Sequence, residues 1–378
     1  MTEAFIGRLS AIWLWKETTK GTKVSPQVWI PKTTGVLKPS FEVATDDSGY
    51  WVIDETFDTI TTKNFSDLSL EWIVRDDSIW YLFLWALWTY TKLKVFKGTV
   101  TGWTPARWDS VTGGVLKKIV TVWSDTYYCF SWTVSAWTIT NWTRSLTATE
   151  VSSVNAHFFE RANTNVPVTF TLYGDDPVAS SYATYCVINS LEISCEVADF
   201  VKFKAEFQWK QMQAIESWSE PTPAYSDEPA FTAAMAWVRF ANNEAWLNAA
   251  TEICMQNFRI AINNNVTDMQ CFWDTDVSAF YKQQFGIEGD FEAVYNDTDL
   301  RDYVINSSKK ALRFYAENNS NGYSAMFIDV MKCGLNEWTP TDNNNEITKQ
   351  TMWFTGQFDN ATWTSIEILL FNSNSTGY

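Results

Sequence analysis

The sequence contains a single histidine, His157, and none of the short motifs that mark common catalytic sites. It has no P-loop, no GxGxxG, no GxSxG and no HExxH. A lone histidine among aromatic neighbours is more often a hydrogen-bonded structural residue than a general base. The adjacent acids at 46–47, 76–77 and 175–176 are typical of turns and helix starts. We therefore predict a protein with no catalytic site and no cofactor.

Metal-binding patterns, basic charge and long apolar runs are missing as well. The six cysteines show no CxxC or other metal-ligand spacing, which predicts free core thiols and no metal site. A net charge of −16 argues against a surface that grips nucleic acid. The first ten residues lack the pattern of a signal peptide. The longest apolar run, 79–88, is shorter than the roughly 20 residues that span a bilayer, so we expect a soluble, cytoplasmically made protein without membrane contact.

The most informative stretch that is present covers residues 67–88. Polar and apolar side chains alternate from 67 to 75, which predicts a half-buried strand. Asp76, Asp77 and Ser78 supply the chemistry of a helix N-cap. Residues 79–87 then carry apolar side chains at helical spacing, which predicts a core-facing helix.

This strand and helix recur near the other end of the chain, at 288–307. A shift of 221 residues aligns Leu70 with Phe291, and the same shift aligns Asp76 with Asp297. The recurrence of a strand, an acidic break and a helix in one register predicts two copies of one domain.

The remaining segments divide the chain by composition. A proline-containing stretch of small and acidic residues separates the halves and predicts a linker. Between the first helix and residue 155, β-branched and aromatic residues broken by Gly and Pro predict short strands, with no counterpart in the second half. Residues 191–209 predict one long strand. The expected divisions are an N-terminal arm at 1–34, a first domain at 35–212 with an insertion at about 92–155, a linker at 213–229, and a second domain with its tail at 230–378.

Short segments in a fixed order match a known family across both halves. They lie at 7–9, 16–19, 29–33, 53–55, 73–76, 162–165, 188–192, 201–203, 256–260 and 300–304. On these segments the chain resembles the tail tube (major tail) proteins of long-tailed, non-contractile bacteriophages. The resemblance implies a mainly β fold with two tandem tail-tube-type β-sandwich domains, each with a flanking α-helix. Their strands would contribute to a ring-shaped inner β-barrel, which closes exposed sheet edges.

The resemblance also implies a mechanical function in the virion. Stacked rings would form the tail tube, a conduit for DNA ejection into the host. Because each chain carries two domains, a ring of six domains needs three chains, so we favour a pseudo-hexameric trimer over a hexamer. The implied partners are further copies of the chain, a tape measure protein, a terminator protein, and viral DNA that passes without specific binding.

A conduit for DNA should have an acidic wall, because repulsion of the phosphates avoids tight ion pairing. The polar side chains of the repeated strand are the candidates for this wall, and the alternative is that they lie on the outer solvated surface. The candidate lumen-facing residues are Asp67, Ser69, Glu71, Glu288, Asp290 and Glu292.

Glycine is scarce, at 15 residues in 378, and tryptophan is abundant, at 22. Glycine is therefore about 4% of the chain, where about 7% is usual. Tryptophan stands where the resemblance leads us to expect glycine at Trp13, Trp15, Trp51, Trp72, Trp80, Trp85, Trp88, Trp209 and Trp353. A UGA codon reassigned to glycine but translated as tryptophan explains both deviations, whereas Trp29 and Trp338 are expected to be genuine. The alternative is a lineage that packs tryptophan at these positions.

Two other functions fit parts of the composition. A β-sandwich rich in Trp and Asn is also typical of a carbohydrate-binding or adhesin module, although such a module has no need of the duplicated strand and helix. A glycoside hydrolase would need two placed carboxylates, and no such pair stands out.

Overall fold

The computed structural model describes residues 10–31, 34, 35, 37–48, 56, 58–101, 107, 109–111, 114–122, 125–131, 138–141, 144–176, 179–215, 222–318, 323–341 and 347–375. These residues are mainly in β-strands, as predicted, with two α-helices and short 3₁₀ turns at Ala233–Met235 and Glu244–Trp246.

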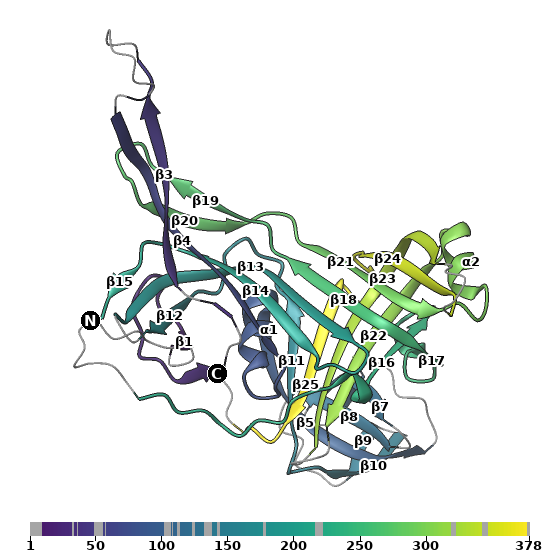
Figure 1. The fold of residues 1–378 in the computed structure, drawn as a ribbon. Helices are drawn as coiled ribbons and strands as arrows, with labels where there is room; N and C mark the ends of the chain where they lie inside the picture. The colour runs from purple at the N-terminus through teal and green to yellow at the C-terminus, as the bar shows by residue number, and fades with distance from the viewer. Residues whose placement is uncertain are drawn as a thin grey trace.

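One long antiparallel sheet crosses both halves of the chain (Figure 1). Its strands, in spatial order, are β3 (Lys38–Asp46), β4 (Asp58–Ile73), β14 (Lys202–Trp209), β13 (Ser181–Glu196), β18 (Met255–Asn263), β21 (Gly286–Val294), β24 (Lys349–Gly356) and β23 (Ser324–Thr341). Alternate side chains of these strands point to one apolar face and one polar face.

The predicted strand at 67–75 is confirmed, and it is the end of the longer strand β4. Leu68 and Leu70 are buried while Glu71 is exposed, as the alternation requires. The remainder of β4 pairs with β3 in a hairpin that projects from the body (Figure 1). A second hairpin, β19 (Val266–Gln270) and β20 (Val277–Lys282), lies beside it and contacts it through a 2.6 Å ion pair between Lys63 and Asp268.

The prediction of one long strand over 191–209 is wrong. The segment forms the end of β13, a turn, and then β14, which pairs back on β13. Ala198 takes a left-handed conformation in this turn, with φ of +65°. The only turn-forming residue at the reversal is Asp199, whose Oδ1 accepts the N–H of Phe200 at 2.7 Å, and the sequence analysis overlooked this signal.

A second set of strands packs on the apolar face of the long sheet. In spatial order they are β5 (Trp88–Thr101), β11 (Asn155–Arg161), β25 (Ile366–Asn372), the first half of β23, β22 (Lys309–Asn318), β16 (Ala236–Ala241) and β17 (Glu252–Ile253). The long strand β23 therefore belongs to both sets. Leu70 and Phe203 from the long sheet share one hydrophobic core with Phe159, Ile328 and Leu370 from the second set.

Helix α1 (Ile79–Leu87) confirms the predicted helix, and all nine of its residues are buried. The prediction that the preceding Asp76, Asp77 and Ser78 cap it is wrong. Ser78 itself has helical dihedral angles and makes no side-chain cap hydrogen bond. Its backbone N–H instead donates to Oε2 of Glu228, at 2.8 Å, from a segment 150 residues away. Helix α2 (Asp299–Ile305) is shorter, and there Oδ1 of Asp297 does accept the N–H of Asp299, at 3.1 Å.

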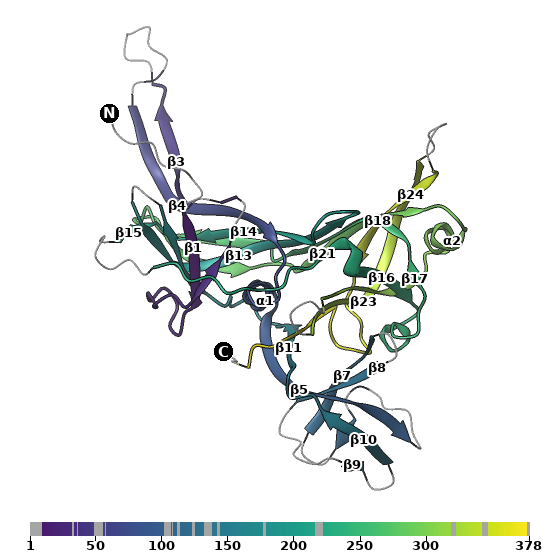
Figure 2. The same cartoon turned by 60° about the horizontal axis from the view of Figure 1, so that its bottom comes forward.

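Several strands lie in the segments expected to be arm, insertion and linker. Residues 1–9, 32 and 33 of the arm and 216–221 of the linker lie outside the described residues. The short strands predicted for the insertion are confirmed, and they lie at one end of the molecule (Figure 2). The strands are β1 (Ala11–Lys16) and β2 (Val28–Ile30) in the arm; β6 (Ser110–Val111), β7 (Gly114–Val122), β8 (Asp125–Ser131), β9 (Thr138–Asn141) and β10 (Arg144–Glu150) in the insertion; and β15 (Gln213–Ala214) in the linker. Strand β1 pairs with β12 (Phe170–Asp175), and β15 pairs with β13.

Candidate functional site

The polar side of the long sheet carries more acids than bases, and we call it the acidic face. Strand registers place the following acids on it: Asp67, Glu71, Glu192, Glu196, Glu206, Glu288, Asp290, Glu292 and Glu337. The bases on the same face are Lys38, Lys202, Lys204, Arg259 and Lys349. The excess of acid gives this face a negative potential.

All six residues that the sequence nominated for the lumen belong to the acidic face. They form two groups: Asp67, Ser69 and Glu71 on β4, and Glu288, Asp290 and Glu292 on β21. Strands β14, β13 and β18 lie between the groups. With about 4.8 Å between neighbouring strands, the two groups are roughly 19 Å apart. The structure thus places them on one surface without bringing them together.

The bases of the acidic face lie close to carboxylates. Arg259 contacts Asp290 at 2.6 Å and Glu192 at 3.0 Å, and Lys349 contacts Glu292 at 2.8 Å. A phosphate that approaches this face therefore meets cations that are already neutralised. Sequence reasoning missed Arg259 and Glu192, although the alternation around 258–262 gave the signal that Arg259 lies opposite to the apolar side chains.

The only histidine is part of a buried polar network beneath α1. Tyr90 donates its hydroxyl proton to Nδ1 of His157 at 2.9 Å, and Nε2 donates to Oδ1 of Asn372, also at 2.9 Å. Burial lowers the pKa of His157 to about 4, so the ring is neutral at physiological pH. The structural role predicted for this residue is confirmed.

Three carboxyl groups gather at the start of α1. Glu228 accepts the Ser78 N–H, Ser324 donates its hydroxyl to Asp76, and Asn372 donates to Asp77 at 3.1 Å. Burial raises the pKa of Glu228 to about 7 and that of Asp76 to about 6. Both groups therefore hold a proton more tightly in the folded chain than in the unfolded one, where carboxyl pKa values are near 4.

This site predicts a loss of stability as pH rises. A raised folded-state pKa means that the folded form binds more protons, so the free energy of unfolding falls between about pH 4 and pH 7. Replacing Glu228 by Gln keeps an oxygen acceptor for Ser78 and removes one of the titrating groups. We expect Glu228→Gln to be more stable than the parent by roughly 1–3 kcal/mol at pH 8, and close to it at pH 4. Thermal unfolding of both proteins at the two pH values measures this, and an equal difference at both would contradict it.

A cluster of ions, buried except for a partly exposed Glu244, links the insertion to the second half of the chain. We call Lys118, Glu244, Arg313, Asp329 and Glu367 the buried ion cluster. Nζ of Lys118, on β7, contacts Glu244 and Asp329 at 2.7 Å and Glu367 at 2.9 Å. Arg313 holds both carboxylate oxygens of Asp329, at 2.6 and 2.8 Å. Sequence analysis missed this cluster, because Lys117 and Lys118 are adjacent and a bulge between Leu116 and Lys118 decides which of them points inward.

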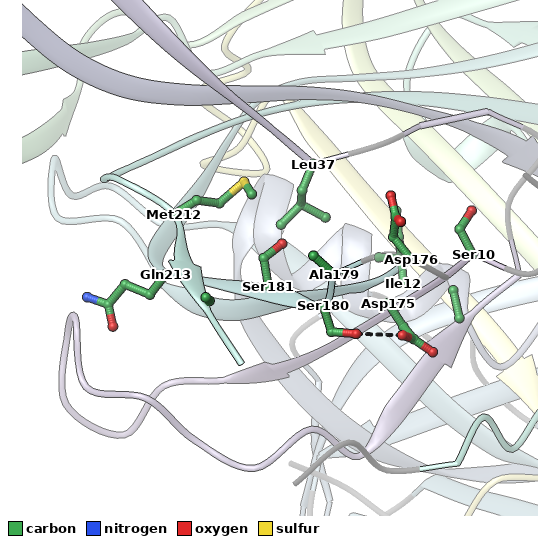
Figure 3. Close-up of a pocket in the computed structure, with 13 residues that line it drawn as sticks. Ser10, Ile12, Leu37, Asp175, Asp176, Ala179, Ser180, Ser181, Met212 and Gln213 are labelled. Carbon is green, nitrogen blue, oxygen red and sulfur yellow. Dashed lines mark hydrogen bonds between the residues drawn. The ribbon is translucent and has the colours of Figure 1, made fainter. Parts of the chain in front are cut away.

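A cavity of about 290 Å³ lies beside β1, β12, β13 and β15 (Figure 3). The Ser180 hydroxyl donates to Oδ1 of Asp175 at 2.6 Å, and Asp176 lies nearby. Much of the remaining lining is small or apolar, including Leu37 and Met212. A serine–carboxylate contact needs a base such as histidine to become a nucleophilic site, and the one histidine is buried under α1. Asp175 ends strand β12 and Asp176 follows it, while the turn predicted there extends into residues 177 and 178, which lie outside the described residues.

Within the described residues, no group of three or more His, Cys, Asp or Glu side chains is arranged to hold a metal ion. Of the helices that the structure describes, none has the length and apolarity to cross a membrane. Cys129, Cys186, Cys195 and Cys333 are buried free thiols, as predicted, while Cys254 is exposed and Cys271 is partly exposed.

The strand order and the acidic face define a mainly β protein. The family model of the phage tail tube protein matches residues 7–352, so the chain belongs to the phage tail tube protein family. Membership gives it a structural role in the tail tube and a place in the virion tail. A comparison with curated proteins found no match.

Proposed function

We propose that three copies of the chain form a pseudo-sixfold ring and that the rings stack into a hollow tail tube. The observation that carries this proposal is a repeat within the long sheet. Strands β3, β4, β14 and β13 have the same spatial order as β18, β21, β24 and β23. In each set one strand has a bulge at an asparagine, Asn189 in β13 and Asn336 in β23. A chain with two such units supplies two of the six units of a ring.

The domain organisation proposed from the sequence follows the same repeat. The first unit would occupy 35–212 and the second 230–378, with the insertion at about 92–155 on the outer wall and 213–229 as the link. The joint of β13 with β18 supports this view, because the sheet continues from one unit to the next within the chain. A tape measure protein and a terminator protein would contact the assembled tube.

In this proposal the tube conducts DNA into the host during ejection, and the acidic face lines the channel. The local neutralisation of Arg259 and Lys349 supports that function, since a passing phosphate backbone would find few available cations. No chemistry is required of the chain.

Assembly is the first test of the proposed function. Mass photometry of the purified protein should show trimers, or species larger than trimers, in place of a stable monomer of 43.4 kDa. Negative-stain microscopy should show rings or tubes. A monomer at every concentration without tubes would overturn the proposal, whereas a hexameric ring would overturn only the trimer.

The position of the acidic face is tested by chemical accessibility in assembled tubes. Glu71→Cys on β4 and Glu150→Cys on β10 are compared, both in a background with Cys254 and Cys271 replaced by Ser. Both native glutamates are exposed in the single chain. We expect a small maleimide to label both sites, and a large PEG-maleimide to label only the cysteine at 150, because it cannot enter the channel. Equal labelling of both sites by the large reagent would place the acidic face outside.

A further inference from the structure

We propose that the long sheet continues from one copy of the chain to the next, with 335–341 of β23 pairing antiparallel with β3 of the neighbouring copy. This inference rests on the proposed ring and specifies its strand contact. Among the described residues, β3 pairs with β4 alone, and 335–341 pair with β24 alone. Both strands therefore present an outer edge. An exposed edge of this kind is a template for pairing with another chain.

The template for the contact is present inside the chain, where β13 pairs with β18. In this joint Glu192 lies opposite Ala261, and Ser190 lies opposite Asn263. The repeat makes β23 the equivalent of β13 and β3 the equivalent of β18. The free edges are thus the two halves of a second joint of the same kind, and only another copy can complete it.

The equivalence of β13 and β23 follows from strand registers. In each unit, residues that lie opposite one another on three neighbouring strands form a row across the sheet. The row in the first unit is Leu70, Ala205 and Leu191, and the equivalent row in the second unit is Phe291, Met352 and Trp338. The asparagine bulges support the match, because Asn189 and Asn336 each lie two residues before the last member of their row. Glu337 is therefore equivalent to Ser190, and Thr339 to Glu192.

The equivalence of β3 and β18 follows in the same way. In the second unit, Phe258 of β18 lies opposite Phe291 of β21. In the first unit, Thr34 lies opposite Glu71 and Lys38 lies opposite Asp67, so Gly35 is opposite Leu70. Because Leu70 is equivalent to Phe291, Gly35 is equivalent to Phe258. Three residues further along each strand, Lys38 is equivalent to Ala261, and five residues further along, Ser40 is equivalent to Asn263.

The joint between copies then has a definite register: Thr339 faces Lys38, and Glu337 faces Ser40. Lys38 lies diagonal to Glu337 in this register, which brings opposite charges together on one face. Phe41, which is 54% exposed in the single chain, corresponds to Asn264. Asn264 is fully buried in the joint within the chain, so the same cover would protect the exposed ring of Phe41.

The asparagine at the bulge contributes hydrogen bonds to the joint. Within the chain, the backbone oxygen of Asn189 accepts the N–H of Asn264 at 2.8 Å, and its Oδ1 accepts the N–H of Val266 at 3.0 Å. Asn336 occupies the same bulge and is exposed. In the proposed register its backbone oxygen would accept the N–H of Phe41 of the next copy.

Two prolines make the joint between copies weaker than the one within the chain. Pro39 and Pro340 occupy positions whose equivalents, Ile262 and Ile193, belong to the hydrogen-bonded pairs of the template, so each removes one donor. Prolines on free edges also discourage pairing in wrong registers before assembly. Because a single joint of this kind is weak, separate copies would remain unpaired until ring closure forms several such joints at once.

Disulfide trapping tests the register. In a background with Cys254 and Cys271 replaced by Ser, Lys38→Cys is combined with Thr339→Cys. Cα atoms at such a pair are about 4.5 Å apart, within the range that a disulfide spans. The control combines Lys38→Cys with Glu337→Cys, which shifts the pair by two residues on the same face and puts the atoms beyond that range. We expect at least fivefold more covalent oligomer from the matched pair under mild oxidation, and none from the single-cysteine variants.

The outcomes separate this inference from the proposed function. Tubes on microscopy with no matched cross-link, or with equal cross-linking of both pairs, would overturn the strand joint and leave the tube. Absence of tubes in the parent protein would overturn the proposed function itself. Hydrogen exchange of the unsubstituted protein gives a second measurement without any variant, since the amides of 335–341 should gain protection on assembly if the joint forms and stay unprotected if it does not.

Discussion

Lys118→Met is expected to lower the free energy of unfolding by about 3–5 kcal/mol, because it removes the fully buried cation that pairs with three carboxylates. The three carboxylates that Lys118 contacts are Glu244, Asp329 and Glu367, and the side chains of Asp329 and Glu367 are at most 1% exposed. Methionine fills a similar volume but leaves negative charges facing one another without their common cation. Chemical denaturation of the two proteins, followed by tryptophan fluorescence, measures the difference.

Lys94→Met is the matched control for this substitution. Lys94 is also in the insertion and forms a 2.9 Å ion pair with Glu150, but both side chains are more than a third exposed. Exposed pairs contribute about 0–1 kcal/mol, so the control should differ little from the parent. Equal effects of the two substitutions would show that the buried ion cluster does not hold the insertion in place.

The same cluster predicts a response to acid. Burial alone would raise the pKa of Asp329, but Arg313 and Lys118 outweigh it and hold that pKa well below its usual range. The stabilisation is therefore present above the unfolded-state pKa, near 4, and is lost as pH falls through the lower folded-state value. This dependence is opposite in sign to that of Glu228 and Asp76, whose stabilisation is lost as pH rises above about 4, so the two sites together place the greatest stability near pH 4.

The elements that the sequence predicted correctly are those with strong local periodicity. Alternation identified the end of β4, and helical spacing identified α1, because each element buries one side against the core and its apolar residues therefore recur at a regular spacing. The polar side of the long sheet followed from the same alternation, and this is why all six nominated residues lie on one face. A two-residue period states which side chains share a face of a strand, and it does not say which strands will be neighbours.

The features that the sequence missed depend on contacts between distant segments. The Ser78 N–H is capped by Glu228, and Lys118 meets Glu367 from the other end of the chain. The turn at Ala198 is set by pairing of β13 with β14, which overrides the local preference of the residue. In each case long-range packing decided between local alternatives, and a single sequence gives no measure of that packing.

The native virion protein is expected to carry glycine at most of the positions where tryptophan replaces an expected glycine. Trp88 ends helix α1 in a left-handed conformation, with φ of +71°. Glycine is the residue most often found at this position of a helix, since a side chain there is strained. The Trp88 ring also lies 4.2 Å from Nζ of Lys282, a buried amine whose pKa is lowered to about 7 by burial and by Arg161. Glycine at 88 would relieve the backbone and uncover that amine.

The packing of other tryptophans agrees with this interpretation. The indole N–H groups of Trp13, Trp85 and Trp209 are buried and have no acceptor among the described residues, whereas buried indoles usually find one. The ring centroid of Trp85 lies 3.7 Å from that of Phe170, closer than the usual 4.5–7 Å between aromatic rings. Trp338, expected to be genuine, donates its N–H to Oε1 of Gln350 at 3.0 Å. Trp51 lies outside the described residues.

Peptide mass spectrometry of the protein from virions decides the question, because Trp and Gly residues differ in mass by far more than instrument error. Native peptides that carry tryptophan at 80, 85 and 88 would end the hypothesis. Recombinant variants give an independent test through backbone strain. Trp88→Gly should be more stable than Trp88→Ala by about 1 kcal/mol, since only glycine tolerates the positive φ without strain. Trp338→Gly should instead be destabilising, because it removes a satisfied side chain from a strand, and this contrast distinguishes recoded sites from genuine ones.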